Sequence, residues 1–64
     1  MNKYGMGDRL KPISGSYNSY LFVVTNYYYD EELNDYVYET YGVDSPSVIH
    51  YFAQSDVEFS GNMK

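Results

Sequence analysis

Cysteine is absent from the 64 residues, which excludes both a disulfide framework and a thiolate metal site. Long apolar runs are absent as well, so no segment of the sequence is expected to form a membrane-spanning helix. The first eight residues also lack the apolar stretch of a secretory signal, and we therefore expect a cytoplasmic protein. A chain of this length has room for one domain with a small core, which depends on packing, self-association or a partner for its stability.

Basic residues are scarce and unevenly placed. Four Lys and Arg stand against nine Asp and Glu, and residues 12–63 contain eight of these acids and no Lys or Arg. Proteins that bind nucleic acid directly use Lys and Arg to displace counterions from the phosphates. A basic segment would also be needed to hold the chain on an anionic membrane surface. The sequence therefore predicts neither direct nucleic-acid binding nor membrane binding.

Aromatic residues are abundant, with ten Tyr and three Phe making 20% of the chain. Disordered segments are poor in aromatics, so this composition indicates a folded domain. Tyr and Phe also favour the pleated surface of a sheet. The composition therefore favours an ordered β protein.

Alternation of apolar and polar residues predicts strands, and polar or turn-forming segments at 14–19, 30–35 and 42–46 separate them. The expected strands cover 8–13, 20–29, 35–41, 47–52 and 57–59. Ser55 and Asp56 predict a short helical turn before the last strand. A helix beginning at Asp30 and running to Tyr38 is the alternative, which would make the fold α+β.

Apolar side chains in these strands supply the candidate core. The alternation leaves open which face of the 20–29 segment points inward, because both of its faces are apolar. The core candidates are Leu10, Leu21, Val23, Val37, Val48, Phe52 and Val57.

Two short segments resemble a known type of domain. The sequence Tyr-Gly-Met-Gly-Asp-Arg-Leu at 4–10 resembles the opening of small SH3-like barrel domains of phage and prophage proteins. The sequence Phe-Ala-Gln-Ser-Asp-Val-Glu-Phe at 52–59 resembles their ending, where a short turn leads into the closing strand. The resemblance implies an all-β fold, a small five-stranded SH3-like barrel over residues 4–59 with a short 3₁₀ turn before the last strand. Residues 60–64 would then be a frayed C-terminal tail.

The acidic segment at 30–35 begins like a calcium-binding loop, with Asp30, Glu32 and Asn34 at alternate positions. However, Asp35 stands where such a loop needs glycine, and Tyr41 stands where it needs a bidentate glutamate. We therefore expect no metal site and no cofactor. A solvated hairpin tip that keeps the strand edge from pairing with other chains is the simpler interpretation.

His50 is the only histidine and the only candidate general base of that type. The sequence has no Gly-x-Ser-x-Gly motif and no cysteine nucleophile to accompany it. A chain of this length also has little room for a substrate pocket. The sequence therefore predicts no catalytic residues and a protein that is not an enzyme.

Ten tyrosines are more than so small a core can hide, because each buried hydroxyl needs a hydrogen-bond partner. Exposed Tyr beside carboxylates suits a partner with a basic, partly apolar surface. The simpler alternative is that Tyr replaces aliphatic residues in the core. On the first interpretation the contact face comprises Tyr28, Tyr29, Asp30, Glu31, Glu32, Asp35, Tyr36, Tyr38, Glu39 and Tyr41.

These observations predict a non-catalytic protein-binding module. Together with the resemblance, they suggest a phage-encoded modulator or inhibitor of a host protein, acting in the host cytoplasm through its acidic, tyrosine-rich hairpin. Two alternatives remain. The acidic face could mimic nucleic acid in the basic groove of a DNA- or RNA-binding protein, or the chain could be a structural protein that assembles with itself as a homodimer.

Overall fold

The computed structural model describes residues 1–17 and 19–62, so position 18 of the 14–19 loop and positions 63–64 of the predicted tail lie outside it. The elements are β1 (Asp8–Pro12), β2 (Phe22–Asp30), β3 (Asp35–Gly42), β4 (Ile49–Ala53), the 3₁₀ helix η1 (Gln54–Asp56) and β5 (Val57–Asn62). The fold is all-β with a short 3₁₀ turn before the last strand, as predicted, and the alternative helix over 30–38 is wrong. Within the described ranges, no helix is long and apolar enough to cross a membrane.

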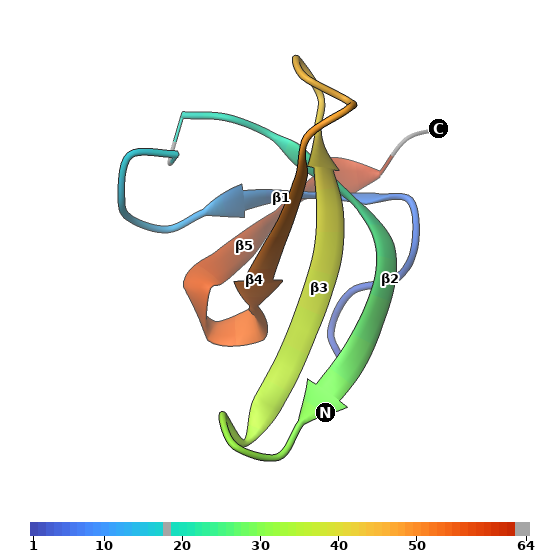
Figure 1. Cartoon of the computed structure of the whole chain (residues 1–64), viewed down its shortest axis with the longest axis vertical. Coiled ribbons are helices and arrows are strands. Elements are labelled where there is room, and N and C mark those ends of the chain that lie inside the picture. The colour runs from blue at the N-terminus through green and yellow to red at the C-terminus, as the bar shows by residue number, and fades with distance from the viewer. Residues whose placement is uncertain (18, 63–64) are drawn as a thin grey trace.

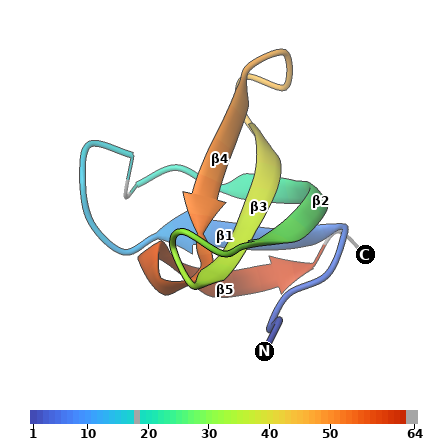
Figure 2. The same cartoon turned by 60° about the horizontal axis from the view of Figure 1, so that its bottom comes forward.

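All five strands belong to one antiparallel sheet with the order β4-β3-β2-β1-β5. Figures 1 and 2 show β2 and β3 as long curved strands, with β1 and β5 running across the direction of β4. η1 connects β4 to β5, the two strands at the ends of this order, which do not pair with each other in the described part of the chain. The sheet is therefore open and curved, and its concave side holds the core.

The last strand is longer than the alternation predicted. Leu10 pairs with Phe59 and Arg9 pairs with Gly61, so Ser60 is an extra residue that forms a bulge in β5. Gly61 has a φ of +116°, a conformation that residues with a Cβ rarely adopt. Residues 60–62, which the prediction assigned to a frayed tail, therefore belong to β5, and Gly61 and Asn62 pair with β1.

The core joins four strands. It consists of Leu10, Val24, Tyr38 and Val57, with Phe52 packed against it. Each of the four is at most 4% exposed, so the concave side of the sheet excludes water around them. Burying aliphatic side chains of this size stabilises a fold by about 1.5–3 kcal/mol each.

Most of the predicted core is confirmed. Leu10, Val23, Val37 and Val57 are buried, whereas Leu21 and Phe52 are half-buried. Val48 is 45% exposed, and its assignment to the core is wrong. It precedes β4 in a turn, where its backbone N–H donates a hydrogen bond to the Ser45 carbonyl at 3.0 Å. The buried residues that the prediction omitted are Pro12, Phe22, Val24, Tyr38, Thr40 and Gly42.

A β-bulge in β2 decides which way its tyrosines point. Val24 and Asn26 pair with consecutive residues of β3, so Thr25 is an extra residue. Side chains alternate along a strand, and the bulge shifts this alternation by one position. Tyr27 and Tyr29 therefore share the core side of the sheet with Val24. We call this side the inner face and the opposite side the outer face.

Candidate functional site

Tyrosine is distributed unevenly between the surface and the interior. Tyr38 is fully buried, and Tyr4, Tyr36 and Tyr41 are half-buried. The remaining six side chains are exposed, at Tyr17, Tyr20, Tyr27, Tyr28, Tyr29 and Tyr51. The expectation that the interior cannot hold every tyrosine is confirmed.

Tyr38 is 0% exposed and cannot belong to a contact face, so its predicted role as a binding residue is wrong. Its hydroxyl donates a hydrogen bond to Oε1 of Gln54 at 2.6 Å and accepts one from the backbone N–H of Tyr4 at 3.4 Å. The side-chain amide of Asn2 also lies against this hydroxyl. Burial raises the pKa of Tyr38 above its ordinary value, because the ionised phenol would lose its hydration.

The partners of Tyr38 hold the N-terminal segment in place. Gln54 in η1 accepts a hydrogen bond from the backbone N–H of Lys3 at 2.9 Å and donates one to the carbonyl of Met1 at 3.0 Å. The ring of Tyr4 packs on Tyr38 with 5.5 Å between the ring centroids. Tyr38 therefore acts as a structural residue that joins the N-terminus, β3 and η1.

The inner-face tyrosines form a row that continues from the core toward the hairpin tip. The ring of Tyr36 lies 6.5 Å from that of Tyr27 and 5.2 Å from that of Tyr29, both in edge-to-face arrangements. The hydroxyl of Tyr29 donates a hydrogen bond to Oδ1 of Asn34 in the turn. Two of the predicted contact residues, Tyr29 and Tyr36, thus pack mainly against each other.

The outer face carries a different set of side chains. Glu39 of β3 pairs with Tyr51 of β4, and on the same face Tyr28 pairs with Val37 and Tyr41 pairs with Ile49. Val37 is buried and Tyr41 is half-buried. The exposed members and the central carboxylate form a surface that we call the outer patch, made of Tyr28, Glu39, Ile49 and Tyr51.

Glu39 organises the outer patch through hydrogen bonds. The hydroxyl of Thr25, the bulge residue, donates to Oε2 at 3.2 Å, and the hydroxyl of Tyr51 donates to Oε1 at 3.4 Å. The negative charge of Glu39 raises the pKa of Tyr51, because it opposes a second negative charge nearby. Of the predicted contact residues, Tyr28, Glu39 and Tyr41 lie on the outer face of the hairpin. The prediction omitted Tyr51, which joins the patch only through the pairing of β3 with β4.

The acidic tip is not a uniform cluster of free charges. Oδ1 of Asp30 accepts hydrogen bonds from the backbone N–H groups of Glu32 and Leu33, at 2.9 and 3.3 Å. This is an Asx turn that shapes the hairpin loop, and an aspartate directly before a polar turn is the sequence signal for it. Asp30 therefore serves the turn, while Glu31 and Glu32 project from it as exposed carboxylates.

Asp35 also serves the fold. Its Oδ1 accepts a hydrogen bond from the backbone N–H of Tyr36 at 2.9 Å, and its Oδ2 accepts one from the backbone N–H of Ser55 at 3.0 Å. The hydrogen bond from Ser55 is the main reason that the pKa of Asp35 lies below its ordinary value. Of the four acids at the predicted contact tip, two are thus held by backbone hydrogen bonds.

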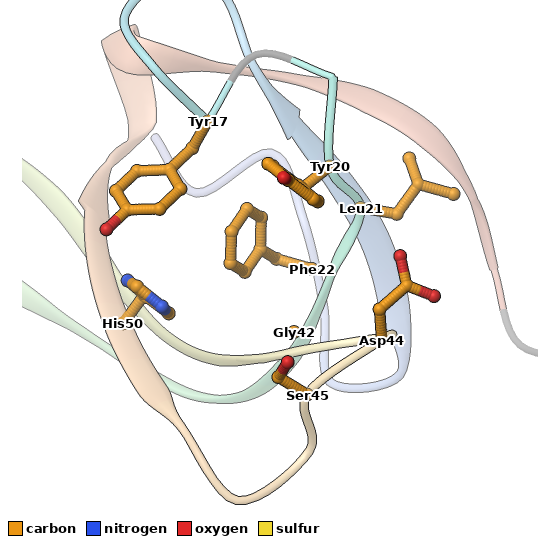
Figure 3. Close-up of a pocket in the computed structure, with 8 residues that line it drawn as sticks. All are labelled: Tyr17, Tyr20, Leu21, Phe22, Gly42, Asp44, Ser45 and His50. Atoms are coloured by element: carbon orange, nitrogen blue, oxygen red, sulfur yellow. The ribbon is translucent and has the colours of Figure 1, made fainter.

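A pocket of about 210 Å³ lies on the inner side, between the loop after β1 and the loop after β3. Its lining residues are Tyr17, Tyr20, Leu21, Phe22, Gly42, Asp44, Ser45 and His50. Figure 3 shows Phe22 between Tyr17, Tyr20 and His50, with Asp44 and Ser45 on the other side of the opening. No sequence pattern marked this pocket, because its two walls come from loops far apart in the chain.

His50 is part of the aromatic wall of this pocket. Its ring centroid lies 5.0 Å from those of Tyr17 and Phe22, and it stacks on Phe52 at 6.0 Å with 14° between the planes. Nowhere in the described ranges do three His, Asp or Glu side chains come together as a metal site would need. Packing therefore accounts for the position of the imidazole.

A comparison of the chain with family models, curated proteins and solved structures found no match.

Proposed function

We propose that the chain is a non-catalytic protein-binding module that docks through the outer patch and the adjoining acidic tip. The observation that supports this most directly is the pair of exposed rings, Tyr28 and Tyr51, on either side of Glu39 on the outer face. Tyr51 is 58% exposed, and exposed apolar area of this kind often marks interaction sites. Tyr contributes a large rigid contact surface at low entropic cost.

Charge indicates the chemistry of the partner. The hairpin tip presents Glu31 and Glu32, the patch is centred on Glu39, and residues 12–63 contain no Lys or Arg. A partner surface that is basic and partly apolar would complement both the carboxylates and the rings. The order of the strands and the 3₁₀ turn before β5 support an SH3-like barrel for the open, curved sheet. In keeping with that resemblance, we propose that the chain is phage-encoded and modulates a bacterial host protein.

Affinity capture with the tagged full chain from bacterial lysates, followed by mass spectrometry, tests this function. We expect a stoichiometric partner whose affinity falls by about 2 kcal/mol or more on Tyr51→Ala, the cost typical of a central interface aromatic. Ile13→Ala is the matched control, because Ile13 is 56% exposed and lies outside the patch. Equal capture by both variants, or capture of no stoichiometric partner from several hosts, would overturn the proposal.

Salt dependence separates this function from nucleic-acid mimicry. A mimic neutralises several basic groups at once, so its affinity falls steeply with salt. The backbone hydrogen bonds of Asp30 and Asp35 leave Glu31 and Glu32 as the projecting charges of the tip, which favours docking by rings. We expect a shallow salt dependence, and a steep one would instead support mimicry.

Self-assembly is favoured by a separate feature, the outer edge of β4. This edge strand carries exposed Ile49 and Tyr51 and pairs only with β3 among the described residues. Two copies could pair along it to form a homodimer with a continuous sheet. Sedimentation at high micromolar concentration tests this, and a strict monomer would remove the homodimer while leaving the docking proposal intact.

A further inference from the structure

The inner-side pocket has an aromatic lining and an acidic rim. Tyr17 lies 6.3 Å from Tyr20 and 6.2 Å from Phe22 between ring centroids, both in edge-to-face arrangements. The face of an aromatic ring carries partial negative charge, which attracts a cation placed over it.

Asp44 adds a full negative charge at the opening. Unlike Asp30 and Asp35, it makes no hydrogen bond or ion pair with any residue that the structure describes, so both carboxylate oxygens are available. Backbone hydrogen bonds hold the loop around it: Val43 N–H donates to the Leu21 carbonyl at 3.0 Å, and Ser45 N–H donates to the Gly42 carbonyl at 3.2 Å. The carboxylate therefore stands on a defined loop at the mouth of the pocket.

We infer that this pocket receives a cationic side chain, a lysine or arginine of the partner protein, with the cation over the rings of Tyr17 and Tyr20 and beside the carboxylate of Asp44. This inference rests on the proposed function, since it supplies one specific contact for a basic partner. The combination of aromatic rings, a carboxylate and a lining without Lys or Arg is what selects a cation over a neutral side chain. The volume of about 210 Å³ is enough for one long side chain.

The pocket is tested directly by NMR titration of the full chain with Nα-acetyl-lysine amide, using Nα-acetyl-norleucine amide as the uncharged analogue of similar length. With the lysine amide we expect chemical-shift changes at Gly42, at Ser45 and in the ring of Tyr17, with a Kd on the order of 10 mM. With the norleucine amide we expect chemical-shift changes that are at least about threefold smaller. Equal binding of the two amides would show an apolar pocket without cation preference and would overturn the inference. Absence of shifts with both amides would overturn it as well.

Two substitutions and a control assign the contacts. Asp44→Asn keeps the shape of the side chain and removes its charge, and Tyr17→Leu removes a ring; each is expected to weaken lysine binding at least about threefold. Glu58→Gln is the matched control, because it removes the same charge from an exposed side chain of β5 that does not line the pocket, and it is expected to leave binding unchanged. Asp44 lies on an exposed loop, so its variant is expected to fold even if Tyr17→Leu does not. Lysine binding that Asp44→Asn leaves unaltered would contradict the inference.

The same variants distinguish a failure of this inference from a failure of the proposed function. If Asp44→Asn captures the partner as well as the wild type does while Tyr51→Ala does not, the pocket inference is wrong and the docking function stands. If lysine binds the pocket but lysates yield no partner, the docking function is wrong and the pocket remains a cation site.

Discussion

Oδ2 of Asp35 accepts a hydrogen bond from the backbone N–H of Ser55 at 3.0 Å, and this contact joins the first residue of β3 to η1, 20 residues further along the chain. An acid that the sequence suggested as a binding residue is thus a structural link. The same carboxylate also accepts a hydrogen bond from the N–H of Tyr36 through its other oxygen. Both oxygens are occupied, and the pKa of Asp35 is lowered because the hydrogen bonds favour the ionised form.

Asp35→Asn is expected to destabilise the fold at neutral pH, because the amide offers one acceptor oxygen where two N–H groups need one each. The pKa of Asp35 in the folded state lies below its ordinary value of 3.8. The stabilisation by the ionised carboxylate is therefore present above about pH 3.8 and is lost as the pH falls through the lowered folded-state pKa. Urea unfolding of both proteins from pH 7 down to pH 2 measures this.

We expect the wild type to unfold at a higher urea concentration than Asp35→Asn at pH 7. The difference between the two urea midpoints is expected to narrow at acid pH. Glu31→Gln serves as the control, since Glu31 is exposed at the hairpin tip, and its midpoint is expected to follow that of the wild type. A gap that stays constant down to pH 2 would show that the charge of Asp35 has no part in stability.

Tyr38→Phe is expected to reduce the free energy of unfolding by about 0.5–1.5 kcal/mol, the usual net contribution of a buried hydrogen bond. The ring still fills the core, but Gln54 and the N–H of Tyr4 lose their partner. Urea unfolding at pH 7 followed by circular dichroism measures the change. Tyr20→Phe is the control, because the exposed Tyr20 ring lies away from this hydrogen-bond network, and an equal effect of both variants would contradict the prediction.

Tyr38 also affects how the stability of the fold is expected to change at alkaline pH. Because its pKa is raised in the folded state, the stabilisation is fully present below the ordinary value of 10.0 and is lost as the pH rises through the raised folded-state pKa. Circular dichroism between pH 9 and pH 12 follows the alkaline unfolding of both proteins. We expect Tyr38→Phe to unfold less steeply with rising pH than the wild type does. Parallel curves would mean that ionisation of other groups drives alkaline unfolding.

Val24→Ala and Val48→Ala make a matched pair for the core. Val24 is 1% exposed, so removing two methyl groups leaves a cavity, and the expected loss is about 2 kcal/mol of unfolding free energy. Val48 is 45% exposed in a turn, so Val48→Ala is expected to change the unfolding free energy by no more than about 0.5 kcal/mol. Urea unfolding compares them, and a larger cost at Val48 would contradict the position of the core.

Glu39→Gln is expected to lower the pKa of Tyr51 toward its ordinary value, because the charge of Glu39 is the main reason that this pKa is raised. NMR titration of the Tyr51 ring signals measures the change. Glu58→Gln is the control, since its carboxylate lies on β5, which is not adjacent to β4 in the sheet order. An unchanged Tyr51 pKa in Glu39→Gln would mean that the two side chains do not meet on the outer face.

The local elements of this protein follow from local sequence. Alternating residues mark β3, and the polar segments at 30–35 and 42–46 separate the strands as predicted. Ser55 and Asp56 mark η1 before the last strand. Strand periodicity and turn chemistry depend on residues a few positions apart, so one sequence contains the information for them.

The orientation of the tyrosines required the tertiary structure. A period of two assumes an unbroken strand, and the extra residue at Thr25 moves Tyr27 and Tyr29 to the inner face. The sequence shows no glycine or proline at this point that would have indicated a bulge. The composition alone determined that rings would be exposed; only the pairing of β2 with β3 decided which ones.

The separation of structural from available acids was also decided by contacts between distant residues. The sequence determined an acidic all-β chain with no Lys or Arg over residues 12–63 and more rings than its core could hold. Whether a carboxylate is free depends on which backbone N–H groups fold against it, and for Asp35 one of the two groups belongs to Ser55, 20 residues away in the chain. The pocket between Tyr17 and Asp44 likewise depends on the tertiary structure. Two loops that are distant in sequence meet beside Phe22 to form it, and only the folded backbone brings such segments together.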